Sequence, residues 1–143
     1  SALLVGTIRT FDAAMQADIH ARLRRRAEGI AAGHGATVEV TIEPQVPVTI
    51  NDPDLAAMLL PTLQRVLPGR VVEARRTTAA EDFSHYGRRV PALFLFLGVT
   101  PAGELATAAG LHSPRFTIDE SALPTGVRVF VHLAADYLFA AAR

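Results

Sequence analysis

Residues 91–98, Pro-Ala-Leu-Phe-Leu-Phe-Leu-Gly, form a continuous apolar run that ends at a glycine. The length of this run and its flanking proline and glycine are typical of a β-strand that is buried on both faces. Strands of this kind belong to sheets that helices cover on both sides. The run therefore predicts an α/β fold for the part of the chain around it.

The first fifty residues predict a strand, a helix and a second strand. Residues 3–11 are rich in apolar and β-branched side chains, and residues 37–42 alternate apolar with polar side chains. Between them, apolar side chains recur every three or four residues from Ala13 to His34, as in an amphipathic helix. Asp12 suits the N-cap of this helix, and the glycines near residue 34 suit its C-cap. The pattern predicts half of a split α+β domain.

Residues 51–54, Asn-Asp-Pro-Asp, mark a boundary between domains. Asp52 can cap a helix and Pro53 suits its first turn, so a helix is expected to run from here to about Leu67. Pro61 lacks a backbone donor and is expected to kink or split this helix. Beyond it the sequence predicts a short strand at 70–74, an irregular polar stretch at 77–87 and a last helix that starts near residue 122 or 124.

Composition narrows the classes of function. The 143 residues are half hydrophobic, and 14 basic residues balance 14 acidic ones. A neutral chain has no general attraction for nucleic acid or anionic membranes, so we expect neither as a partner. The absence of cysteine excludes disulfides and thiolate metal ligands within the chain and fits a cytoplasmic protein.

Two charged stretches have plain structural interpretations. The basic run from Arg22 to Arg26 could bind phosphate, but a solvated helix face is favoured. Arg128, His132 and Asp136 interrupt the apolar stretch 127–142 at four-residue spacing, which argues against a membrane span. The favoured interpretation is a helix buried over most of its circumference with one wet stripe; a relay of the three side chains is the alternative.

Three short segments could carry chemistry. His112 lies in Leu-His-Ser-Pro-Arg-Phe (111–116), a loop after the apolar run, where an imidazole can serve as a metal ligand. Glu81 and Asp82 suit metal binding or proton transfer, and they equally suit the cap of a short helix. Arg9, in an otherwise apolar segment, could hold a carboxylate or point to solvent.

The order and spacing of these segments resemble the amidohydrolase branch of the aminoacylase-type metallopeptidases, which includes hippurate hydrolases and N-acyl-amino-acid amidohydrolases. The resemblance covers nearly the whole chain. It rests on Gly-Thr-Ile-Arg-Thr-Phe-Asp (6–12), Val-Thr-Ile-Asn-Asp-Pro (48–53), Glu-Asp-Phe-Ser (81–84), the apolar run 91–98, Leu-His-Ser-Pro-Arg-Phe (111–116) and Asp-Glu-x-Ala-Leu-Pro-x-Gly (119–126).

The resemblance implies a two-domain enzyme. Residues 1–50 would belong to a ferredoxin-like lid and dimerisation domain, and residues 51–143 to the C-terminal part of a zinc-peptidase-like α/β catalytic domain. His112 matches a ligand of two divalent metal ions, zinc or manganese. Glu81 matches a supporting residue that orients a ligand or the substrate, although Ala79 and Ala80 stand where the family usually has glycine. The substrate would be an N-acyl amino acid, and the enzyme a homodimer.

The family's other metal ligands and its catalytic base have no counterpart in these residues. We therefore expect the chain to be the C-terminal portion of such an enzyme, to be inactive by itself and to retain no metal, because catalytic zinc sites use three protein ligands. The alternative is a non-catalytic dimerisation module derived from the same family.

Overall fold

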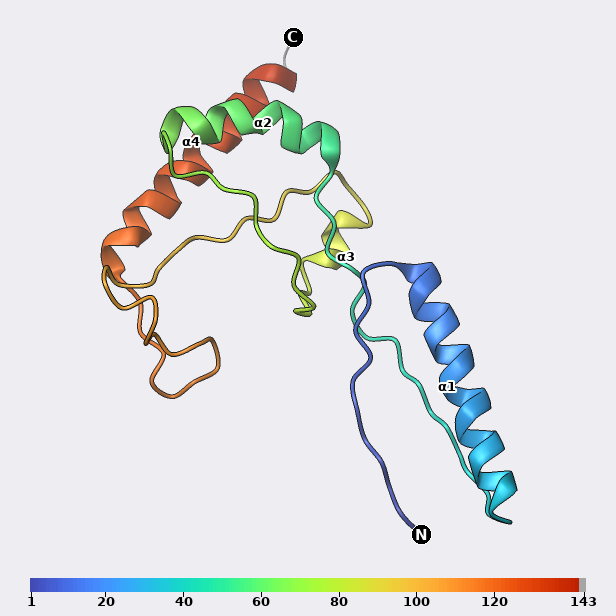
Figure 1. Ribbon diagram of the computed structural model, residues 1–143. Coiled ribbons are helices and arrows are strands. Elements are labelled where there is room, and N and C mark those ends of the chain that lie inside the picture. Colours follow the sequence, from blue (N-terminus) through green and yellow to red (C-terminus); the bar gives the residue numbers. More distant parts are fainter. Residues whose placement is uncertain (142–143) are drawn as a thin grey trace. The chain divides into compact units, whose positions relative to one another are not determined.

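The computed structural model describes residues 1–141, and every regular element in that range is a helix (Figure 1). The remaining described residues form turns and irregular segments. In chain order the elements are α1 (Ala13–Gly33), α2 (Pro53–Val66), the short α3 (Ser84–Gly87), the 3-10 helix η1 (Glu120–Ala122) and α4 (Leu123–Ala141).

The predicted α/β fold is wrong, because residues 1–141 contain no β-strand and the fold is helical. A strand is stable only when a neighbour completes its ladder of hydrogen bonds. No described segment pairs in this way with residues 3–11, 37–42, 70–74 or 91–98. Leu4 and Val5, which the pattern assigned to a strand, are 92% and 87% exposed. The fold of residues 1–141 is therefore neither half of a ferredoxin-like sheet nor part of a catalytic α/β sheet.

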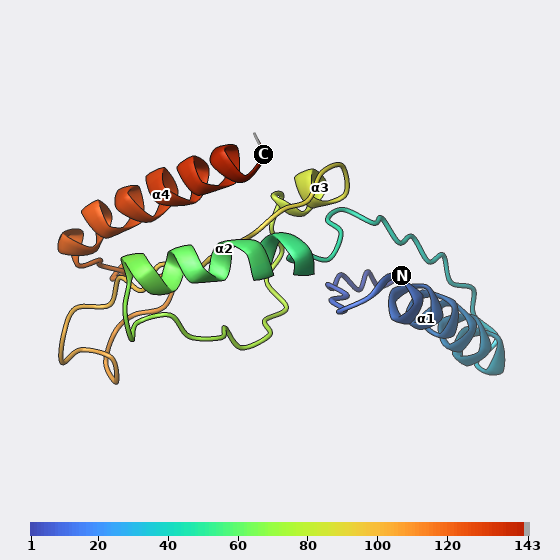
Figure 2. The ribbon, with the colours of Figure 1, turned by 90° about the horizontal axis from the view of Figure 1, so that it is seen from above.

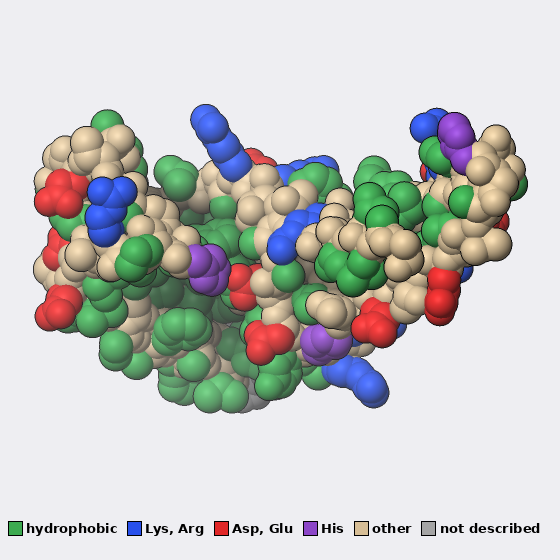
Figure 3. Space-filling model, turned by 90° about the horizontal axis from the view of Figure 1, so that it is seen from below, with side chains coloured by type: hydrophobic (Ala, Val, Ile, Leu, Met, Phe, Trp, Pro, Cys, Tyr) green, Lys and Arg blue, Asp and Glu red, His purple; other side chains and the backbone are tan. Residues whose placement is uncertain are grey.

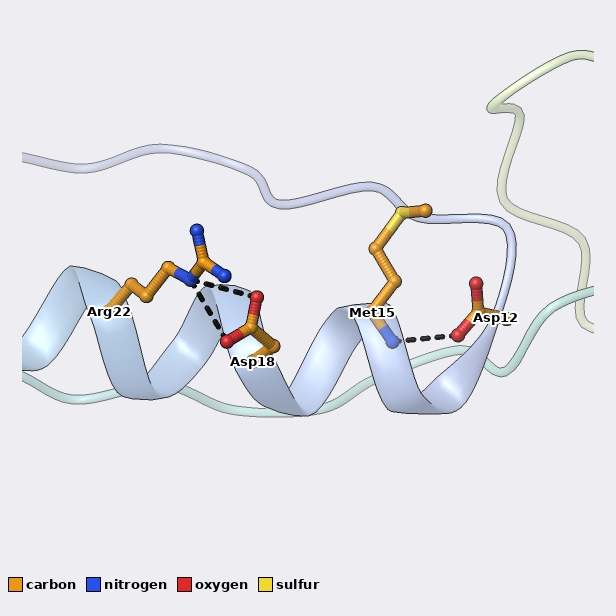
Figure 4. A network of polar contacts seen from close by, with 4 residues as sticks. All are labelled: Asp12, Met15, Asp18 and Arg22. Carbon is orange, nitrogen blue, oxygen red and sulfur yellow. Dashed lines mark hydrogen bonds and ion pairs between the residues drawn. The ribbon is translucent and has the colours of Figure 1, made fainter.

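Helix α1 begins and ends where its local sequence predicts. The Asp12 carboxylate accepts a hydrogen bond from the Met15 N–H at 2.6 Å, which closes the N-terminal turn (Figure 4). At the other end the Ala36 N–H donates to the Ala31 carbonyl at 2.8 Å, and the Gly35 N–H donates to the Ala32 carbonyl. This pair of bonds is a Schellman motif, which requires the positive φ of 65° that Gly35 adopts.

The basic run on α1 lies on an exposed helix face. Arg22 forms an ion pair with Asp18 one turn earlier at 2.8 Å (Figure 4), and Arg24 donates to the Val40 carbonyl at 2.7 Å. Helix α1 has no buried residue. Two of the four arginines thus have partners within the chain, which supports the solvated-face interpretation of this run.

Helix α2 is capped as predicted but is not split. The Asp52 carboxylate accepts from the Leu55 N–H at 2.8 Å, and Pro53 occupies the first turn. Pro61 lies inside a single continuous helix. The carbonyl that Pro61 leaves without a donor belongs to Ala57, which is exposed, so water can hydrate it.

The chain folds as two compact units, each made of two stretches of sequence. The first unit combines Ser1–Asn51 with Arg75–Phe94, and the second combines Asp52–Ala74 with Leu95–Arg143. The two units do not test the predicted assignment of residues 1–50 to a lid domain and 51–143 to a catalytic domain. That assignment stays a prediction.

The core of the second unit is the contact between α2 and α4, which lie side by side in both ribbon views (Figures 1 and 2). Leu59 and Leu63 of α2 and Val129 and Leu133 of α4 are 6–8% exposed. They are four of the five hydrophobic residues that are buried in the described part of the chain, the fifth being Ala92. The contact is therefore the main source of stability that this unit draws from the hydrophobic effect.

A polar contact borders this core. The Asp136 carboxylate of α4 accepts a hydrogen bond from the Thr62 hydroxyl at 2.5 Å and from the Arg65 guanidinium at 2.6 Å. The pKa of Asp136 lies below its ordinary value, chiefly because Thr62 hydrogen-bonds the carboxylate, with Arg65 adding a hydrogen bond and a positive charge. Asp136 thus joins the two helices while its side chain stays 40% exposed.

Helix α4 exposes large apolar side chains, although it was predicted to expose only one polar stripe. Asp136 faces α2, whereas large apolar side chains of the same helix are exposed: Val127 64%, Phe130 73%, Val131 60%, Leu138 66% and Phe139 72%. Many hydrophobic side chains are visible on the face drawn in Figure 3. The prediction that this helix is buried over most of its circumference is wrong. Within residues 1–141 no helix combines the length and apolarity that a membrane crossing needs.

Candidate functional site

His112 lies in the first of two consecutive β-turns in the second unit. The Ser113 N–H donates to the Gly110 carbonyl at 3.2 Å and closes the first turn, and the Phe116 N–H donates to the Ser113 carbonyl at 3.0 Å and closes the second. Pro114 occupies the position in the second turn where its fixed φ is favoured. The Ser113 hydroxyl also accepts from the Arg115 N–H at 3.2 Å. Ser113 and Arg115 therefore shape the loop that presents His112.

The backbone of His112 adopts a φ of 69°, in the left-handed region that favours glycine. His112 is the third residue of the turn from Gly110, where a positive φ makes the turn type II. Holding an L-residue there costs about 1–2 kcal/mol. The side chain is exposed, so packing does not explain why histidine rather than glycine occupies this position.

The segment after the loop is anchored by hydrogen bonds. The Asp119 N–H donates to the Val99 carbonyl at 2.7 Å, and the Asp119 carboxylate accepts from the Ser121 N–H at 2.9 Å. The pKa of Asp119 lies below its ordinary value because the side chain and the backbone of Ser121 hydrogen-bond the carboxylate. Asp119 thereby caps η1, which leads directly into α4.

Glu81 lies in the first unit, at the start of the turn that leads into α3. Its carbonyl accepts from the Ser84 hydroxyl at 2.6 Å, and Ser84 is 2% exposed. The Phe83 ring packs against Phe94 with 5.5 Å between ring centroids. The Asn51 side chain exchanges two hydrogen bonds with the Phe94 backbone, at 2.7 and 3.0 Å. The backbone at half-buried Glu81 is therefore well held.

The two predicted site residues lie in different compact units. His112 belongs to the second unit and Glu81 to the first. Among residues 1–141 no group of three or more His, Asp or Glu side chains could hold a metal ion. Since catalytic zinc is held by three protein ligands, the described residues do not fit a complete zinc site. His112 offers at most one ligand.

Arg9 has a partner within its own unit. Its guanidinium donates to the Thr78 carbonyl at 2.7 Å, so it joins the N-terminal segment to the stretch before Glu81. The sequence favoured solvent for this side chain, and Arg9 is indeed exposed while making this contact. The contact ties together two segments that lie 69 residues apart in the chain.

One basic cluster was not predicted from the sequence. His85, Arg88 and Arg89, at and just beyond α3, line a pocket in the first unit. The signal was present in the sequence, because a histidine followed by arginines three and four residues later places all three on one side of a helical turn.

With the geometry in place, the chain can be compared with known proteins. Residues 3–136 match the model of peptidase family M20/M25/M40. The chain belongs to this family. The predicted resemblance to metallopeptidase-type amidohydrolases is thereby confirmed, and so is hydrolase parentage.

Several curated relatives of this family member are named hydrolases. N-acetylcysteine deacetylase of Bacillus subtilis (strain 168) is 34% identical over 133 residues, which cover 93% of this chain and 33% of the relative. Thermostable carboxypeptidase 2 of Saccharolobus solfataricus is 31% identical over 92% of this chain and 33% of its own length. N-acetyldiaminopimelate deacetylase of Streptococcus suis is 32% identical over 89% and 32%. The chain thus spans about a third of the length of these relatives.

Proposed function

We propose that the protein hydrolyses the amide bond of N-acyl amino acids with divalent metal ions, zinc or manganese, and that His112 is one of the metal ligands. Family membership supports amide hydrolysis, and two of the relatives are named as deacetylases of N-acetylated amino acids. The observation that carries the role of His112 is its backbone. An exposed imidazole sits at a strained φ of 69°, where glycine would be free of strain, and such strain clusters at functional sites.

Glu81 has a supporting role in this proposal. Its well-held backbone and half-buried position suit a carboxylate that orients a ligand or the substrate. The other metal ligands come from outside residues 1–141, because these residues hold no group of three ligands. The relatives are about three times as long as this chain, so the activity, a homodimeric state and a cytoplasmic location are proposals for the whole protein. The 143 residues alone are expected to be inactive and to bind metal weakly.

The test measures hydrolysis of N-acetylcysteine, N-acetyldiaminopimelate and hippurate by the chain and by any longer gene product that contains it, with Zn²⁺ or Mn²⁺ added. In the longer product, His112→Ala should lower both hydrolysis and bound metal, with kcat/KM falling at least about 100-fold. His34→Ala is the matched control, since His34 is also exposed and ends α1. Equal effects of the two substitutions would remove His112 from the metal site.

A non-catalytic dimerisation module is the second candidate. The exposed apolar side chains of α4 favour it, because extended apolar surface marks sites of protein association. Sedimentation of the chain discriminates the two: a tight dimer together with no hydrolysis by any longer product would support the module over the enzyme.

A further inference from the structure

The first unit carries a pocket of about 430 Å³ whose lining consists of His85, Arg88 and Arg89. All three side chains are exposed, so the pocket is open to solvent. Pockets for small molecules are mostly apolar, whereas this one is lined by an imidazole and two guanidinium groups. Its chemistry therefore selects for a negatively charged ligand.

The backbone holds these three residues on one side of a helical turn. The Arg88 N–H donates to the Ser84 carbonyl at 3.2 Å, and the Arg89 N–H donates to the Tyr86 carbonyl at 2.8 Å. These bonds extend the helical winding of α3 (Figure 1) beyond Gly87, so that residues 85, 88 and 89 share a face. Below them Ser84 is buried and its hydroxyl is bonded to Glu81. The platform under the cluster is thus rigid.

The cluster has no counter-ion in the described part of the chain. Neither a side-chain hydrogen bond nor an ion pair joins the side chains of His85, Arg88 or Arg89 to any residue of 1–141. Arg22 and Arg65, by contrast, each pair with an aspartate at 2.8 and 2.6 Å. Adjacent guanidinium groups repel one another, so a bound anion would relieve this repulsion.

We propose that this pocket binds a phosphate group, as inorganic phosphate or as a phosphate monoester of small size. Guanidinium groups match phosphate oxygens in bidentate geometry, and an imidazole N–H adds a third donor. A phosphate dianion has enough oxygens and charge for three donor residues, whereas a carboxylate has two oxygens and one charge. The inference goes beyond the proposed amide hydrolysis and does not depend on it, because His112 and the metal ions play no part in it.

The experiment titrates the chain with inorganic phosphate at low ionic strength, by calorimetry and by NMR of the His85 imidazole. Saturable binding with a Kd on the order of a millimolar is expected for an exposed site with several charge-assisted hydrogen bonds. The Arg88→Gln/Arg89→Gln double variant should weaken binding at least about tenfold. Acetate should bind more weakly than phosphate.

The matched control is Arg25→Gln/Arg26→Gln, which removes the same charge from another adjacent pair of exposed arginines, on α1. This variant should leave the phosphate Kd unchanged within about twofold. An equal loss in both double variants would mean general charge attraction and would overturn the site. Three results with the native chain would also overturn the site: phosphate binding that does not saturate, acetate binding as tight as phosphate binding, and His85 ring resonances that do not move. These three readouts do not depend on the folding of a variant.

Discussion

The contact between α2 and α4 predicts a large difference between two alanine substitutions on the same helix. Leu63 is 7% exposed in that contact, whereas Leu60, one turn earlier on α2, is 42% exposed. Leucine to alanine removes the equivalent of three carbons, worth about 0.8 kcal/mol each when buried. Leu63→Ala should therefore cost about 2.2 kcal/mol of transfer free energy, and roughly 2.5–3 kcal/mol once the cavity is included.

Leu60→Ala is the matched control, because it changes helix propensity by the same amount. Its partial burial limits the cost to about 1.4 kcal/mol by the same arithmetic. Both variants are unfolded in urea and followed by far-UV circular dichroism, and the midpoints are compared at a constant m-value. Equal costs for the two variants, or a cost below about 1 kcal/mol for Leu63→Ala, would show that α2 and α4 do not pack as described.

Four further substitutions have expected outcomes, three that the same urea assay can check and one, at Asp136, that thermal unfolding can check. Thr49→Val should raise the free energy of unfolding by about 1 kcal/mol, because the Thr49 hydroxyl is buried without a hydrogen-bond partner. Gly29→Ala should raise the free energy of unfolding by about 1 kcal/mol through helix propensity, because the new Cβ would meet no atom within 4 Å. Gly126→Ala should raise it by roughly half as much. Its new Cβ would lie 3.1 Å from Leu97 Cδ2, and that half-exposed side chain must shift. Asp136 has a folded-state pKa below its ordinary value of 3.8, so its contacts stabilise the fold above that value and are lost as the pH falls through the folded pKa. The thermal midpoint of the native chain should therefore fall more than that of Asp136→Asn as the solution is acidified from about pH 6 to about pH 2.

Local signals in the sequence predicted the helices well. Asp12 and Asp52 each cap the helix expected to follow them, and Gly35 adopts the positive φ that its C-terminal motif needs. Capping, helix periodicity and turn chemistry act over about four residues, so one stretch of chain contains both the cause and the effect. The stretch 77–87, which was expected to be irregular, contains the single helical turn of α3.

Strand predictions failed because a strand is a property of two segments. The apolar run 91–98 identifies side chains suited to burial, but its sequence does not say which backbone completes its hydrogen bonds. In the candidate site too, the sequence predicts local structure but not contacts between distant segments. Leu-His-Ser-Pro-Arg-Phe forms the turns that its proline and serine favour. The metal site proposed at His112 would need further ligands, since residues 1–141 hold no group of three.

The failed strand predictions and the exposed apolar face of α4 both fit the large surface that this chain leaves uncovered. The chain exposes 11,945 Å². Two independent compact units of half its mass would together expose about 8,600 Å², whatever their placement, so the excess is about 3,300 Å². An excess of this size is at least as large as the surface that one partner contributes to a permanent protein interface, roughly 1,000–2,500 Å². Phe130 and Leu138 of α4, 73% and 66% exposed, belong to this surface. The hydrophobic pattern of the sequence therefore predicted burial on α4 at positions that the described residues leave exposed.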